Sequence, residues 1–84
     1  MKQLSGKFGL TVRQAREQRG WSQEVLADRA GLNRSYLGEI ERGIAMPSLA
    51  SIAKLAAALD TRMSTLVAHC ESVPETITQA AAAS

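Results

Sequence analysis

The residues best suited to catalysis in this sequence are His69 and Cys70, its only histidine and its only cysteine. They are sequence neighbours, and adjacent residues on a helix point about 100° apart, so they cannot readily form a nucleophile–base pair. No glycine-rich phosphate loop is present, and no set of carboxylates, histidines or cysteines has the spacing of a metal site. We therefore expect a protein that is not an enzyme, with no cofactor, no metal and no evident small-molecule effector.

A second group of polar residues is suited to reading nucleic-acid bases. Leu37 and Ile40 share one side of a helix that begins near Asn33. The opposite side then carries Arg34, Ser35, Gly38 and Glu39. An arginine can hold guanine O6 and N7 with two hydrogen bonds, a glutamate can accept from cytosine N4, and a serine can pair with several bases. Tyr36 lies between the two sides, where both packing on the core and contact with DNA fit the pattern.

Helical periodicity and capping residues define the elements that would position these side chains. No segment alternates with a period of two, so we expect an all-α fold without strands. Serine and asparagine are preferred at helix N-termini and glycine just past C-termini. These signals predict five helices: about 7–19, Ser22 to Gly31, Asn33 to Gly43, Pro47-Ser48 to Asp60-Thr61, and about 62–71.

The apolar residues of these helices are mostly aliphatic, because aromatic residues make up only 4% of the chain. One side of each predicted helix is apolar, and these sides together predict a single core. The expected core residues are Phe8, Val12, Ala15, Leu26, Ala27, Leu37, Ile40, Leu49, Ile52, Leu55, Ala56, Leu59 and Leu66.

The length of 84 residues suits one domain, which we expect to cover residues 1–71. Composition changes at Pro74, and residues 72–84 are expected to form a C-terminal tail that is either a dimer-associated helix or disordered. No apolar run approaches the roughly 20 residues of a membrane span, and no signal-peptide h-region is present. We therefore expect a cytoplasmic protein without a membrane partner. Residues 1–21 carry five basic side chains and one acidic one, which by charge alone favours a solvated helix face over a phosphate-binding surface.

The stretch from Ser22 to Gly43 carries the most specific pattern in the chain. Its combination of Ser-Gln, Leu-Ala, Ala-Gly and Ile-Glu-Arg-Gly resembles the helix-turn-helix of the lambda and 434 repressor-like (XRE-type) family. The resemblance continues through Pro47-Ser48-Leu49 and 55–59, and covers about residues 7–70. It implies a five-helix lambda-repressor-like domain that binds double-stranded DNA and regulates transcription.

The resemblance also implies roles for individual residues. Base-reading residues would be Arg34, Ser35, Tyr36 and Glu39. Phosphate contacts would come from Gln23, Asn33, Arg42, Gly43 and Ser48. The resemblance makes the helix from Asn33 to Gly43 the recognition helix, which enters the DNA groove. Arg16 and Glu41 would form a partly buried ion pair that ties the first helix to the end of this recognition helix.

Within the family, the segment from Gly31 to Gly43 looks most like the controller proteins of restriction-modification systems, which are short and dimerise through their last helices. Two residues depart from the family pattern. Val25 places an apolar side chain where a polar one is usual, and Arg62 replaces the usual serine or threonine cap of the fifth helix.

Leftover apolar residues near the C-terminus predict a symmetric homodimer. Leu66 can face the core of its own protomer, but a domain this small cannot cover all of the remaining apolar residues, Met63, Val67, Cys70, Val73 and Ile77. Pairing across a two-fold axis would bury this strip and place two recognition helices on an inverted-repeat operator. The alternatives are a monomer whose fifth helix lies flat on its own core, and an antitoxin or protein-interaction module with the same fold.

Overall fold

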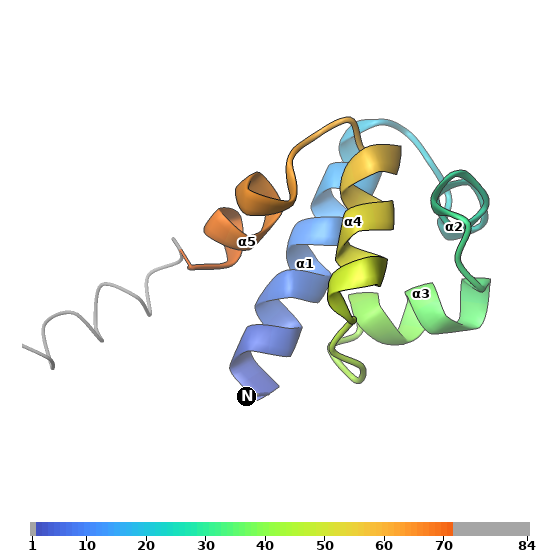
Figure 1. Cartoon of the computed structure of the whole chain (residues 1–84). Coiled ribbons are helices and arrows are strands. Elements are labelled where there is room, and N and C mark those ends of the chain that lie inside the picture. Colours follow the sequence, from blue (N-terminus) through green and yellow to red (C-terminus); the bar gives the residue numbers. More distant parts are fainter. Residues whose placement is uncertain (1, 72–84) are drawn as a thin grey trace, which may run out of the picture.

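The computed structural model describes residues 2–71, which form five α-helices and no strand (Figure 1). The helices are α1 (Lys2–Gln18), α2 (Gln23–Ala30), α3 (Arg34–Glu41), α4 (Leu49–Ala58) and α5 (Met63–Glu71). Helix α1 packs against α3 and α5, α2 packs against α3 and α4, and α4 also contacts α5. The all-α, five-helix fold is thus confirmed. Residues 72–84, predicted to form the tail, lie outside the described residues.

Short capping motifs begin and end the helices that carry the candidate site. Ser22 Oγ accepts a hydrogen bond from Val25 N, and Asn33 Oδ1 accepts from Ser35 N at 2.8 Å. Gly31 ends α2 in the left-handed conformation at φ +67°, which costs glycine little. The turn between α2 and α3 is therefore encoded by local residues, as the sequence predicted.

Helix α1 begins five residues before its predicted start, because tertiary contacts support its first turns. The thiol of Cys70 lies 3.7 Å from the carbonyl oxygen of Leu4, which joins α1 to α5. On another side of α1, Gly43 packs so closely that a Cβ on it would lie 2.9 Å from the Cα of Gly6. The predicted start rested on the helical spacing of apolar residues from Phe8 onward, and this spacing gives no information about contacts with distant segments.

The core contains all but two of the residues expected for it from the sequence, and it also contains Ala30 and Cys70. Its members are Phe8, Val12, Leu26, Ala27, Ala30, Leu37, Ile40, Ile52, Leu55, Ala56, Leu59, Leu66 and Cys70. Ala15 is only partly buried against this cluster. The prediction that Leu49 belongs to the core is wrong, since this residue is 74% exposed. Periodicity gives the direction of a side chain around the helix axis, but not whether a neighbour covers the end of the helix.

Gly9 determines how closely α1 approaches the end of α3. A Cβ at this position would clash with the carbonyl oxygen of Ile40 and lie 2.7 Å from that of Glu41. Because the obstructing atoms belong to the backbone, they cannot move aside as a flexible side chain can. Glycine at position 9 therefore allows the contact between α1 and α3, a role that the sequence analysis missed.

Candidate nucleic-acid interface

The outer side of α3 presents polar side chains above a buried apolar side. Leu37 and Ile40 are fully buried, whereas Arg34, Ser35 and Glu39 are exposed. These three residues line a shallow, open hollow together with Gln23, Gly38 and Arg42. The hollow is therefore built by the N-terminus of α2 and one side of α3, the two elements that the turn at Gly31 joins (Figure 1).

Gly38 lies on this side of α3 as expected, but other side chains cover it. A Cβ at Gly38 would be 3.2 Å from Nη1 of Arg42 and 3.7 Å from Oε1 of Gln23. The residue is consequently buried. Its missing side chain leaves space at the floor of the hollow for the arginine and the glutamine.

Tyr36 is placed between the two sides of α3, with its ring partly buried against the core. Its hydroxyl lies 3.3 Å from Oγ of Ser51 on α4. Ser51 in turn donates its backbone N–H to Ser48 Oγ, the N-cap of α4. Of the two readings that the sequence left open for Tyr36, packing on the protomer is therefore present in the structure.

Arg16 and Glu41 form the ion pair that the family resemblance implied. Arg16 Nε donates to Oε2 of Glu41 at 2.8 Å, and Nη2 donates to Oε1 at 3.0 Å. The Glu41 side chain is 2% exposed and that of Arg16 is 12% exposed. The hydrogen bond to Glu41 raises the pKa of Arg16 above its ordinary value, so the guanidinium of Arg16 remains protonated. Arg16 Nη1 also donates to the carbonyl of Trp21, which joins α1 to the turn before α2.

Gln23 is held by the same carboxylate. Its Nε2 donates to Oε1 of Glu41 at 3.0 Å, so one oxygen of Glu41 accepts from both Arg16 and Gln23. From the sequence, Gln23 was expected to contact a phosphate and Glu41 to pair with Arg16. A hydrogen bond between Gln23 and Glu41 was not predicted. The two residues are 18 positions apart, and nothing in local spacing indicates that α2 and α3 bring them together.

A metal site and a catalytic pair of His69 and Cys70 were the other possibilities that the sequence raised. Among residues 2–71, no group of three or more His, Cys, Asp or Glu side chains could hold a metal ion. His69 is exposed while its neighbour Cys70 is buried, so the two side chains face different surroundings. Within the same residues, no helix is both long and apolar enough to cross a bilayer.

The helix-turn-helix family matches residues 12–66, which include α2, α3 and the interface between them. The chain belongs to this family. The match covers α2, α3 and α4 with the XRE-type motif from Ser22 to Gly43, together with parts of α1 and α5. The structural neighbours of the chain are lambda-repressor-like helix-turn-helix domains. The family predicted from sequence is thus confirmed.

Relatives of this helix-turn-helix chain are transcriptional regulators. The HTH-type transcriptional regulator SutR of Escherichia coli (strain K12) is 34% identical over 77 residues, which are 92% of this chain and 43% of SutR. SinR of Bacillus subtilis (strain 168) is 38% identical over 61 residues, 71% of this chain and 55% of SinR. The chain therefore spans about half the length of these two curated relatives.

Two crystal structures place the helix-turn-helix chain among known folds. The restriction-modification controller protein C.AhdI from Aeromonas hydrophila aligns with a TM-score of 0.72 and 48% identity, over 74% of this chain and 94% of that one. SinR in complex with DNA aligns with a TM-score of 0.68 and 38% identity, over 71% of this chain and 97% of that one. Restriction-modification controllers are therefore among its structural neighbours, as the segment from Gly31 to Gly43 predicted.

The predicted phosphate-binding residues lie at four helix ends of this helix-turn-helix domain, and two of them, Gln23 and Arg42, line the hollow. Asn33 and Ser48 are exposed N-caps of α3 and α4, and each already accepts a backbone N–H through its side-chain oxygen. Arg42 is the exposed C-cap residue of α3. Gly43 follows it at φ +76°, a conformation that suits glycine. Gln23, at the start of α2, is the remaining member of this set.

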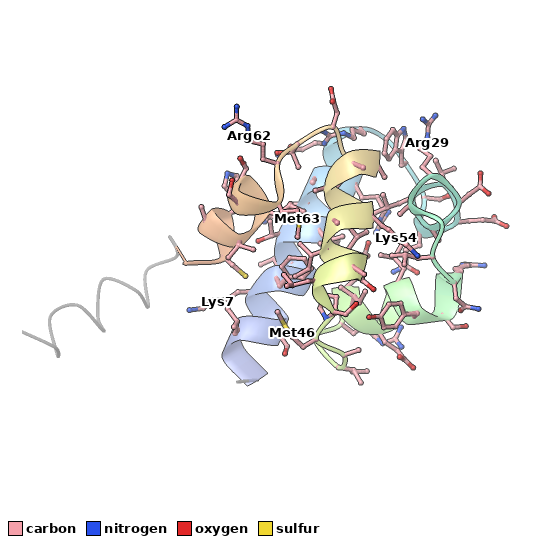
Figure 2. All side chains as sticks on the ribbon, in the orientation of Figure 1. Lys7, Arg29, Met46, Lys54, Arg62 and Met63 are labelled. Atoms are coloured by element: carbon pink, nitrogen blue, oxygen red, sulfur yellow. The ribbon has the colours of Figure 1, made fainter. Side chains whose placement is uncertain are left out.

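The dimer prediction is wrong for one of its residues. Cys70 is 2% exposed, so it is part of the protomer core and offers no surface to a second copy. Met63 points from α5 toward α4 (Figure 2) and packs on the core. Val67 remains 38% exposed. Val73 and Ile77 lie outside the described residues. Cys70 is enclosed because α5 packs against α1, where the thiol lies 3.7 Å from the carbonyl oxygen of Leu4.

Proposed function

We propose that this chain binds double-stranded DNA in a sequence-specific manner and regulates transcription. The observation that carries the proposal is the exposed polar side of α3, held outward by the burial of Leu37 and Ile40. A helix of this kind fits the major groove, where each base pair presents a distinct pattern of donors and acceptors. The likeness to SinR, whose structure was solved in complex with DNA, supports the same conclusion.

The proposed contacts divide into two groups. The side chains assigned to base edges are Arg34, Ser35, Tyr36 and Glu39, of which Tyr36 is the most buried. The residues assigned to phosphates are Gln23, Asn33, Arg42, Gly43 and Ser48, at helix ends and the loop after α3. Phosphate contacts position a protein on the duplex, whereas base contacts determine which sequence it prefers.

We propose further that the chain acts as a homodimer on an inverted repeat, in the manner of a restriction-modification controller. The support for a controller is the 48% identity to C.AhdI over nearly all of that chain. A single domain has few base-facing side chains, so two half-sites would supply the specificity that one lacks. Val67, exposed on α5, is the described residue that best marks the contact between protomers.

Selection of bound sequences from a pool of random duplex DNA tests this function. We expect an inverted repeat whose half-site centres lie about one helical turn, roughly 34 Å, apart. Binding should weaken steeply as salt increases, because Arg and Lys contacts release counterions from the phosphates. Failure to enrich any sequence, together with binding that is insensitive to salt, would point instead to an antitoxin or protein-interaction module.

Replacing Val67 with aspartate tests the dimer. A carboxylate on the outer side of α5 would have to be desolvated in the interface, so we expect dissociation toward the 9.0 kDa monomer. Sedimentation at micromolar concentration without DNA measures the change. Val25→Asp is the matched control, because Val25 is 37% exposed but lies on α2. A wild-type chain that sediments as a monomer would exclude the proposed dimer, and so would an equal mass loss in both variants.

A further inference from the structure

The carboxylate of Glu41 joins three helices and contacts Gln23, which lines the hollow between α2 and α3. It accepts two hydrogen bonds from Arg16 of α1 and one from Gln23 of α2, while Glu41 itself ends α3. Its side chain is 2% exposed, so little water competes for these bonds. Hydrogen bonds to an ionised group are stronger than those between neutral groups, and a site with little water strengthens them further.

This arrangement fixes the orientation of the Gln23 amide. Because Nε2 is turned toward Glu41, the carbonyl oxygen Oε1 lies on the other side, 3.7 Å from the position of a Cβ at Gly38. The Gln23 side chain also lines the open hollow beside Arg34 and Arg42. Glu41 therefore occupies one amide hydrogen and leaves the other, together with the carbonyl oxygen, for groups that enter the hollow.

We propose that Arg16 and Glu41 are positioning residues for DNA contact, acting through Gln23 rather than touching DNA themselves. This inference rests on the proposed function. A free glutamine side chain loses rotamer freedom when it binds, whereas one already held by Glu41 loses less. The ion pair in turn holds the carboxylate, because Arg16 binds both of its oxygens. The pair thus contributes to DNA affinity in addition to its contribution to the fold.

The decisive variant is the double replacement Arg16→Met/Glu41→Leu. A buried ion pair replaced by apolar residues of similar volume often leaves stability unchanged or raised, so we expect the fold to persist. Gln23 loses its anchor, and affinity for the selected duplex is expected to fall about tenfold, as for Gln23→Ala alone. Circular dichroism and thermal unfolding establish the fold, and fluorescence anisotropy with labelled duplex measures the affinity.

The combination of variants separates positioning from a general structural role. If the pair acts through Gln23, adding Gln23→Ala to the double replacement changes affinity by less than about twofold. A further tenfold loss would show independent contributions and overturn the inference. Because the glutamine is uncharged, the slope of log affinity against log salt is expected to match that of the wild type in all three variants.

Glu41→Gln keeps the test informative if the double replacement does not fold. This variant retains a carbonyl oxygen that can accept from Gln23, but it leaves Arg16 without its counter-charge. We expect lower thermal stability together with affinity within about twofold of the wild type at low temperature. A tenfold loss of affinity in the folded Glu41→Gln protein would contradict the proposed route through Gln23.

A matched control and the wild type complete the design. Arg13→Met/Glu17→Leu makes the same two replacements at an exposed ion pair on α1, whose side chains are 58% and 52% exposed, and is expected to leave affinity within about twofold. If the wild type itself shows no preference for the selected duplex over a scrambled one, the proposed function fails. If the wild type binds and the variants behave additively, only the positioning inference fails.

Discussion

Replacing Leu37 with alanine is expected to lower the free energy of unfolding by roughly 2–5 kcal/mol, the range for large-to-small changes in a packed core. Leu37 is fully buried on the inner side of α3, where it holds the recognition helix on the rest of the domain. Removing its side chain loses transfer free energy and leaves a cavity between helices that are joined by short turns. Urea titration followed by circular dichroism measures the change.

Leu49→Ala is the matched control for this prediction. It makes the same chemical change at a residue that is 74% exposed, so we expect an effect within about 0.5 kcal/mol. Equal destabilisation by the two variants would contradict the described packing. It would also indicate that Leu49 is a core residue, as predicted from the sequence.

Arg34→Ala is expected to reduce DNA-binding free energy by about 1–3 kcal/mol and to relax the preference at one base pair in each half-site. Arg34 is the exposed first residue of α3, and it lines the hollow where the edges of bases would enter. Loss of a bidentate contact removes discrimination at the contacted base pair, whereas loss of a phosphate contact weakens binding to all sequences similarly. Repeating the selection with the variant measures both effects.

Arg62→Ala removes the same charge far from α3 and serves as the control. Figure 2 shows Arg62 on the loop before α5, at the end of the domain opposite α3. We expect the Arg62→Ala variant to prefer the same DNA sequences as the wild type. Unchanged affinity and unchanged preference for Arg34→Ala would mean that the recognition surface has been assigned to the wrong side of the domain.

Local residues were enough to predict most of the secondary structure. Ser22, Asn33 and Ser48 each cap a helix through the side-chain oxygen, and Gly31 adopts the left-handed conformation expected after α2. These motifs involve residues within four positions of one another, so short stretches of sequence are enough to predict them. The inward direction of Leu37 followed from helical periodicity for the same reason.

Tertiary structure decided how the helices cover one another and which polar groups meet. Leu49 has the spacing of a core residue but is largely exposed among residues 2–71, whereas Cys70 is enclosed because α5 packs on α1. Gly9 gains its importance only from the backbone of α3 that passes over it. The bond from Gln23 to Glu41 likewise depends on the angle between α2 and α3. Sequence periodicity predicts which way a side chain points from its own helix. Whether that side chain is buried, and which hydrogen-bond partner it meets, depends on segments distant in the chain.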